Sequence, residues 1–176
     1  MSFSDPHHII AQFDLQSGAR VADFGAGGGA VALAAARAVG DAGRVYAIEV
    51  QKELLPRLKN EARGARLHNL EVLWGDVERT SGTHLKDGAV DAVILSNILF
   101  QLTDRTGAVK EAQRVLKPGG KALVVDWSGS FGRMGPDPQH VVTEQSARTL
   151  CEENGFQFVK SISAGEHHYG MIFRKK

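Results

Sequence analysis

The sequence is poor in the residues that cross-link a fold or anchor it in a membrane. Cys151 is the one cysteine, which excludes an internal disulfide and a zinc site built from several cysteines. No apolar run reaches the roughly 20 residues that a membrane-spanning helix needs, and the N-terminus lacks a signal-peptide pattern. We therefore expect a cytoplasmic protein without a membrane span.

Charge of either sign is not in surplus. Lys and Arg number 21 and Asp and Glu number 20, so the formal net charge of +1 gives no overall electrostatic sign of nucleic-acid binding. No stretch is repeated, and 176 residues are the size of one ordinary domain. We expect a single domain over residues 1–176, with a short lead-in over 1–19 and a loop over 127–142.

Glycine is what the sequence has in quantity, and four of its 20 glycines lie within residues 25–29. The apolar segment 21–24 precedes them and the alanine-rich segment 30–39 follows, so the pattern predicts a strand, a tight turn and a helix. Glycine lets the backbone approach a ligand closely, and the first N–H groups of a helix have no partner within it. The stretch therefore predicts a binding site for a polar ligand.

Two classes of ligand compete for this loop. Gly25, Gly27 and Gly29 satisfy a loose dinucleotide pattern, and Glu49 stands where doubly wound folds place the acid that binds ribose hydroxyls. Asp23 favours the other class, because its carboxylate would repel a pyrophosphate and attract a ligand with ammonium and sulfonium groups. A nicotinamide-dependent oxidoreductase is the distant alternative.

Strand patterns alternate with helical patterns along the rest of the chain. Asp5-Pro6, Thr103 or Asp104, and Thr143 mark helix starts, and Lys117 to Gly120 is expected to be a hard stop. A short turn near residues 164–165 makes the last two strands antiparallel partners. The expected strands are 21–24, 44–48, 70–74, 90–95, 122–126, 156–162 and 168–174, and the expected helices are 7–13, 30–39, 51–62, 104–116 and 144–154. Together they predict an α/β sheet with helices on both faces.

Five stretches resemble, in order and at suitable spacing, the motifs of class I S-adenosylmethionine (SAM)-dependent methyltransferases. They are residues 21–29, Glu49, and residues 75–77, 91–97 and 111–121. The last two are most similar to the branch that contains quinone-biosynthesis-type and arsenite-type small-molecule methyltransferases. The resemblance implies a doubly wound, mostly parallel sheet of seven strands in the order 3-2-1-4-5-7-6, with strand 7 antiparallel.

The resemblance also implies which residues bind SAM. They are Asp23, Gly25, Ala26, Gly27, Gly29, Glu49, Val50, Gln51, Asp76, Val77, Ser96 and Asn97. Asp23 would orient the loop and the amine of SAM, Glu49 would bind the ribose hydroxyls, and Asp76 would accept a hydrogen bond from the adenine amino group. Ser96 and Asn97 would lie where methyl donor and acceptor meet. The product would be S-adenosylhomocysteine (SAH).

No motif identifies the methyl acceptor. Ligands lie beyond the carboxyl ends of the strands of such a sheet, where the lead-in, the loop 127–142 on the substrate side and the turn before the last strand are expected to meet. These segments hold five of the seven histidines, His7, His8, His140, His167 and His168. His168 and His140 are the candidates for a general base, because an imidazole titrates near neutral pH. Ordinary hydrogen-bonded histidines and a metal site are the alternatives, and we assign no metal ligand.

We predict a methyltransferase that acts on a small molecule by in-line displacement, as a monomer or a homodimer. One alternative is an RNA or protein methyltransferase with an open acceptor site, in which basic residues hold a polyanion; these are Arg133, Arg148, Lys160, Arg174, Lys175 and Lys176. The other is a SAM-binding protein without catalysis. A single cysteine argues against arsenite methylation, and Cys151 itself is predicted to be a buried small hydrophobe.

Overall fold

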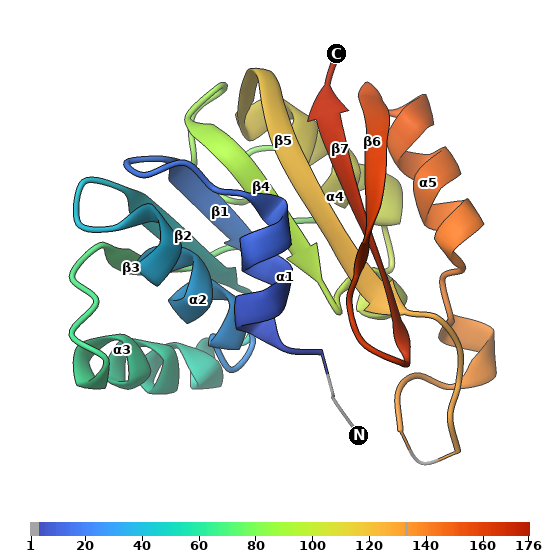
Figure 1. Ribbon diagram of the computed structural model, residues 1–176, viewed down its shortest axis with the longest axis horizontal. Helices are drawn as coiled ribbons and strands as arrows, with labels where there is room; N and C mark the ends of the chain where they lie inside the picture. The colour runs from blue at the N-terminus through green and yellow to red at the C-terminus, as the bar shows by residue number, and fades with distance from the viewer. Residues whose placement is uncertain (1–3, 133) are drawn as a thin grey trace.

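A single mixed sheet forms the centre of the molecule. The computed structural model in Figure 1 describes residues 4–132 and 134–176. Seven strands are paired in the order β3-β2-β1-β4-β5-β7-β6, and β7 runs antiparallel to both of its neighbours. The α/β class and the strand order predicted from the sequence are confirmed.

The elements follow the predicted alternation closely. The strands are β1 Arg20–Phe24, β2 Arg44–Glu49, β3 Leu70–Trp74, β4 Val90–Ser96, β5 Leu116–Trp127, β6 Phe156–Ser163 and β7 His168–Lys175. The α-helices are α1 Pro6–Phe13, α2 Ala30–Val39, α3 Leu55–Gly64, α4 Arg105–Val115 and α5 Glu144–Glu153. Short 3-10 helices are η1 Lys52–Leu54, η2 Leu99–Gln101 and η3 Pro138–His140.

Three helices begin where the sequence places a capping side chain. Asp5 caps α1 by accepting from the N–H of His7, with proline at the start of the helix. Asp104 caps α4 through Gly107, and Thr143 caps α5 through Ser146. Each cap gives a partner to an N–H group that the helix itself leaves without one.

Two predicted boundaries are wrong. The helix expected over 51–62 begins only at Leu55, because Pro56 fits the first turn of a helix but not its interior; the preceding residues form η1. The strand expected over 122–126 begins earlier, at Leu116, although α4 does end before Lys117 to Gly120 as predicted. Leu116 pairs with Val90 and Lys121 pairs with Ala92, so these four residues form an irregularity within the long strand β5.

Helices cover both faces of the sheet (Figure 1). Val21, Ile94 and Leu123 pack with α1 and α2 on one face, and their neighbours in the strands pack with α4 and α5 on the other. Because side chains alternate along a strand, Asp23 and Glu49 lie on the face of α1 and α2, and Asp126 lies on the opposite face. Cys151 is 2% exposed, and burial raises its pKa to about 12, as expected of a small buried residue rather than a nucleophile.

The carboxyl ends of the parallel strands lie together at one edge of the molecule. In Figure 1 this edge is at the bottom, where the β6–β7 turn and the segment between β5 and α5 also lie. Because ligands of such sheets bind beyond the carboxyl ends of the strands, this edge is where a ligand is expected.

Within residues 4–132 and 134–176, no helix is long and apolar enough to cross a membrane.

Candidate active site

A cavity of about 250 Å³ opens at this edge, between the ends of β1 to β4. Its lining comes from the glycine turn, the end of β2, the turn after β3 and the segment after β4. The lining residues are Gly25, Gly27, Ile48, Glu49, Val50, Gln51, Gly75, Asp76, Val77, Glu78, Ile98, Gln101 and Leu102. Seven of the twelve residues predicted to bind the cofactor are among them.

The glycine turn leaves space where any other residue would place a side chain. The N–H groups of Gly25 and Ala26 both donate to the carbonyl oxygen of Ile48, which holds the turn against β2. Gly27 has φ +52°, and a Cβ added there would approach only the carbonyl oxygen of Gly25, at 3.9 Å. Gly29 differs, because its added Cβ would lie 2.5 Å from Leu58. Gly29 therefore allows α2 and α3 to pack closely, and it does not line the cavity.

Glu49 joins the two turns that border the cavity. Its carboxylate accepts from the N–H of Gly27 at 2.9 Å with one oxygen and from the N–H of Gln51 at 2.9 Å with the other. The residue is 4% exposed. Each carboxylate oxygen keeps further acceptor capacity, so the same group that fixes the glycine turn can also accept from a diol in the cavity.

Asp76 lines the cavity, and both of its carboxylate oxygens already have partners. One of its oxygens accepts from the N–H of Glu78 at 3.1 Å, and the other accepts from Nε of Arg79 at 2.9 Å. The side chain of Arg79 is 82% exposed, so this ion pair is worth little and exchanges readily for a ligand.

Asp23 lies beneath the glycine turn and is the strongest electrostatic feature of the site. It is 2% exposed, and among the described residues no hydrogen bond to its carboxylate occurs. Burial, together with the nearby charge of Glu49, raises the pKa of Asp23 to about 7. A buried acid of this kind is stabilised in its ionised form by a cation, and no Lys or Arg among residues 4–132 and 134–176 forms an ion pair with it.

The turn after β3 is held from behind by a buried carboxylate that sequence reasoning did not single out. Glu111 on α4 accepts from the N–H groups of Ser81 and Thr83, from the Thr83 hydroxyl at 2.6 Å, and from Arg114 at 2.7 Å. Gly82, between those two residues, accepts from the N–H of Asp76. Glu111 therefore fixes the position of Asp76 indirectly, through the loop from Ser81 to Thr83.

Replacing Glu111 by glutamine is expected to destabilise the fold by roughly 3 kcal/mol, because one partner of a buried ion pair is lost. Burial alone would raise the pKa of Glu111, but hydrogen bonds from Arg114 and then Thr83 lower it to about 2. Its contribution is thus present above pH 4.5 and lost as the pH falls toward 2. Urea denaturation at neutral and acidic pH measures this. Glu152→Gln, which removes an exposed pair with Arg148, is the control and should change little.

Ser96 and Asn97 end β4 beside the cavity without lining it. Asn97 adopts φ +55°, its N–H donates to the carbonyl of Val125, and its carbonyl accepts from Gln101. Its side-chain oxygen is buried and, among the described residues, has no hydrogen-bond partner. The residues that do reach the cavity from this segment are Ile98, Gln101 and Leu102. Gln101 and Leu102 belong to none of the five motifs. Their position in the cavity is evident only from the structure, in which η2 turns them toward it.

The two histidines proposed as bases lie in different surroundings. His168 stacks on Trp127 with ring centroids 4.3 Å apart, and its Nε2 is buried with no partner among the described residues. Burial, and then the charge of His167, lowers the pKa of His168. His140 lies instead in a second cavity of about 430 Å³, lined by Phe100, Gln101, Leu102, Thr103, Arg105 and His140. The two cavities share Gln101 and Leu102.

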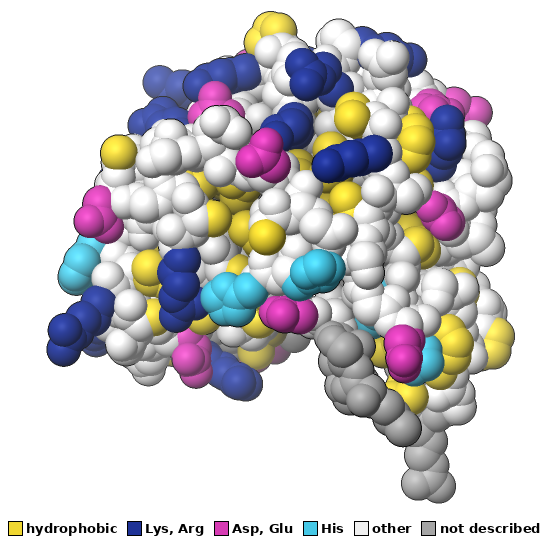
Figure 2. Space-filling model, viewed as in Figure 1, with side chains coloured by type: hydrophobic (Ala, Val, Ile, Leu, Met, Phe, Trp, Pro, Cys, Tyr) yellow, Lys and Arg dark blue, Asp and Glu magenta, His cyan; other side chains and the backbone are white. Residues whose placement is uncertain are grey.

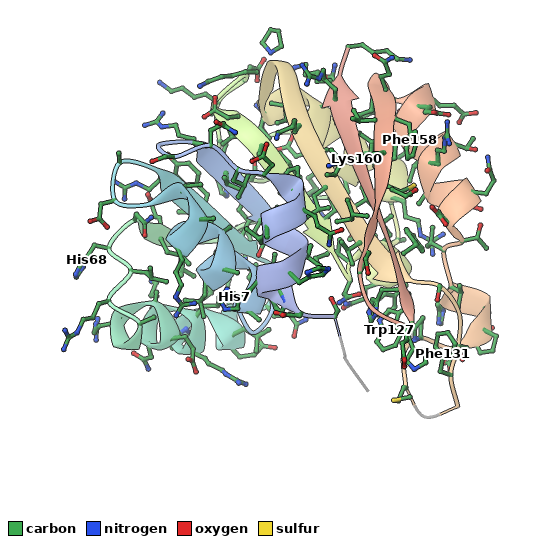
Figure 3. The ribbon with its side chains drawn as sticks, in the orientation of Figure 1. His7, His68, Trp127, Phe131, Phe158 and Lys160 are labelled. Carbon is green, nitrogen blue, oxygen red and sulfur yellow. The ribbon has the colours of Figure 1, made fainter. Side chains whose placement is uncertain are left out.

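The three segments expected at this edge do lie there. The N–H of Ser128 donates to the carbonyl of His167, and Phe131 stacks on His167 at 4.1 Å; Figure 3 shows Trp127 and Phe131 together at this end. A cavity between α1 and the β6–β7 turn is lined by His8 and Glu166, among others. Among residues 4–132 and 134–176, no group of three or more His, Cys, Asp or Glu side chains is placed to hold a metal ion.

Comparison with known proteins gives one matching family over most of the sheet. Residues 22–124 match the model of a methyltransferase domain, which is more than half of the chain. The chain belongs to this methyltransferase family. The span runs from β1 to the middle of β5 and includes every residue that lines the 250 Å³ cavity, so the family predicted from the motifs is confirmed.

Individual relatives agree with this assignment. The ubiquinone/menaquinone biosynthesis C-methyltransferase UbiE of Haemophilus ducreyi is 32% identical over 131 residues, 69% of this chain and 48% of that protein. An arsenite methyltransferase of Aquipseudomonas alcaligenes is 32% identical over 117 residues, 64% of this chain and 34% of that protein. The chain thus spans about half or less of these curated relatives. A SAM-dependent methyltransferase from Aquifex aeolicus has a TM-score of 0.89 at 26% identity, covering 99% of this chain and 91% of that one.

The site has acceptors that suit SAM and open space beside the glycine turn. The open side of Gly27 leaves room for a ligand against the backbone. Glu49 is an acceptor for hydroxyl groups, Asp76 is an acceptor for an amino group, and Asp23 is a buried acid that a cation would stabilise. The residues present therefore fit SAM, the methyl donor predicted from the sequence.

Proposed function

We propose that this chain transfers a methyl group from SAM to a small molecule. The observation that supports it best is that Glu49 and Asp76 both line one cavity, and that the open glycine turn forms a wall of the same cavity. When bound, SAM supplies an electrophilic methyl group on a positively charged sulfur. Glu49 would bind its ribose hydroxyls, Asp76 its adenine amino group, and the turn at Gly25 and Gly27 its methionine part.

The chain's own task in this mechanism is mainly to position the reactants. Methyl transfer needs the acceptor in line with the donor and close to it, and a strong base is not always required. Gln101 and Leu102 form the boundary between the cofactor cavity and the neighbouring one that contains His140. This shared boundary supports the neighbouring cavity as the place where the acceptor lies.

Calorimetric titration of the purified protein with SAM, with NAD as the control ligand, tests the proposal. We expect SAM to bind in the micromolar range and NAD not to bind. Glu49→Gln should weaken SAM binding because the neutral side chain is a poorer partner for hydroxyl donors. Binding of NAD without SAM would overturn the proposal and favour the oxidoreductase alternative.

The alternative with an RNA acceptor has less support, because none of the basic residues invoked for it that the structure describes lines the cavity. Arg133 lies outside the described residues. Arg174 pairs with Lys121 near the start of β5, and Nζ of Lys175 donates to the carbonyl of Leu116. This is the amino-terminal edge of the parallel strands, and Figure 2 shows many Lys and Arg side chains in that upper half of the visible face. A bound polyanion there would lie across the sheet from the cofactor.

His140 is the better of the two candidates for a general base, because it lies in the cavity next to the cofactor. His140→Gln is expected to lower turnover about 100-fold while leaving the SAM dissociation constant unchanged, a loss typical of a missing general base. His168→Gln, the matched control, should have the smaller effect on turnover. Steady-state kinetics with a methylated product as readout measures both, and equal turnover of the two variants would contradict the assignment.

The oligomeric state, the division into one domain with a lead-in, and the cellular location stay predictions from the sequence.

A further inference from the structure

The cavity beside the cofactor cavity has a charge of its own. Arg105, the first residue of α4, lines it together with Phe100, Leu102, Thr103 and His140. Nε of Arg105 donates to the carbonyl of Leu99 at 2.8 Å, which folds the guanidinium back over η2. Its two terminal nitrogens make no hydrogen bond or ion pair with residues 4–132 or 134–176, and they are not among the buried atoms that lack a partner. They therefore face open space.

The guanidinium of Arg105 is not in an ion pair with a described residue, whereas those of several other arginines are. Arg114 is bound by Glu111 and Asp87, Arg79 by Asp76, and Arg148 by Glu152. Two acids near Arg105, the adjacent Asp104 and Asp126, already have backbone partners. Asp126 accepts from the N–H groups of Leu99 and Trp127, and Asp104 accepts from the N–H of Gly107. Arg105 thus keeps two donors for a group that enters the cavity.

The remaining walls are apolar or neutral. Phe100 and Leu102 supply an aromatic and an aliphatic surface, and Thr103 supplies a hydroxyl. A guanidinium binds a planar carboxylate with two parallel hydrogen bonds, whereas a ring or chain attached to that carboxylate would be desolvated by the apolar walls. Another cavity at this edge has the opposite character. Asp5 and Glu166 line it, and it shares no residue with the cofactor cavity.

We propose that the cavity at Arg105 is the acceptor site and that the acceptor is a small carboxylic acid, held through its carboxylate by Arg105 and through an apolar body by Phe100 and Leu102. This inference rests on the proposed function, because it takes the neighbouring cavity to be the SAM site. His140, which lines the same cavity, would take a proton from the atom that is methylated.

A pair of probes tests the inference without knowledge of the true acceptor. Benzoate and benzamide have the same ring and nearly the same shape, and only benzoate is an anion. We expect the SAH-loaded protein to bind benzoate at least about ten-fold more tightly, since charge-assisted pairs are the stronger hydrogen bonds. Saturation-transfer NMR, with each probe in competition with the other, measures this ratio.

Three variants test whether Arg105 is the origin of the preference for benzoate over benzamide. Arg105→Gln should abolish the preference for benzoate, and Arg105→Lys should keep part of it, because lysine retains the charge but not the two parallel donors. Arg148→Gln on α5 is the matched control and should behave as the wild type. Unchanged SAH affinity shows that η2 stays folded in each variant. Equal binding of both probes, or a preference that survives Arg105→Gln, would overturn the inference. Loss of SAH binding by the wild type would instead overturn the proposed function.

Discussion

Replacing Asp23 by asparagine is expected to stabilise the cofactor-free protein at neutral pH and, at the same time, to weaken its binding of SAM. Both effects arise from one buried charge. The charge lowers stability when it has no partner, and it strengthens binding when SAM supplies the partner. Asp23 is 2% exposed, and its carboxylate receives no hydrogen bond from the residues that the structure describes. Folding therefore removes the charge from water without a partner among these described residues, and SAM is expected to supply one.

The direction of the stability effect follows from the pKa. Burial, and then the charge of Glu49, raises the pKa of Asp23 from 3.8 to about 7. Between these values the folded protein binds the proton more tightly than the unfolded chain, so stability falls as the pH rises from 3.8 toward 7. The fall amounts to as much as about 4 kcal/mol at 1.4 kcal/mol per pKa unit. Asp23→Asn should remove this slope, as urea denaturation over that pH range would show.

The direction of the binding effect is opposite. The SAM ammonium and sulfonium groups favour the ionised form of Asp23, so we expect the affinity of the wild type to rise between about pH 6 and pH 7, before the amino group of SAM itself deprotonates near pH 8. Asp23→Asn should bind SAM at least about ten-fold more weakly at pH 7 and lose that pH dependence. Calorimetry across this range measures both properties.

Asp126 provides the matched control. It is 1% exposed, and burial raises its pKa to about 6, but its oxygens accept from the N–H groups of Leu99 and Trp127. Asp126→Asn would turn an amide donor toward one of those donors, so the same substitution should destabilise the fold here. If Asp23→Asn also destabilised the cofactor-free protein, an unrecognised partner of Asp23 would have to exist, and its proposed role toward SAM would be lost.

The parts of the fold that local sequence determines were predictable. Strand and helix patterns, capping side chains such as Asp5 and Thr143, and a turn too short to join parallel strands depend on neighbours within a few residues. The order of the strands came from the resemblance to a known family, and it is confirmed. The same motifs indicated the glycine turn and Glu49, which do line one cavity.

What the sequence did not reveal depends on contacts between distant segments. Gly29 has the same residue type as Gly27, but Leu58 of α3 decides that it serves packing instead of the cavity. Glu111 supports Asp76 from α4, more than 25 residues away along the chain, through the loop at Ser81 and Thr83. His140 and His168 occupy separate surroundings, because η3 and β7 approach the edge of the sheet from different sides.

Gly27→Val is expected to weaken SAM binding by at least about 100-fold, because the valine side chain would occupy the space against which the methionine part of SAM is proposed to lie. The described residues leave room for the first atom of that side chain, since an added Cβ meets only one of their atoms within 4 Å. The loss should therefore appear in ligand affinity, and a factor of 100 corresponds to about 2.7 kcal/mol. Calorimetric titration with SAM measures it, and thermal unfolding of the cofactor-free protein measures the accompanying backbone strain.

Two further variants separate occlusion from strain. Gly27 has φ +52°, which valine adopts with difficulty and asparagine tolerates, so Gly27→Asn adds a side chain with less strain. It should still lose most of the SAM affinity while unfolding close to the wild-type temperature. Gly28→Val is the control, because an added Cβ at Gly28 meets nothing within 4 Å and the residue is exposed outside the cavity. Near-normal SAM binding by Gly27→Asn would mean that the ligand does not lie against this turn, and the assignment of the cavity would have to be abandoned.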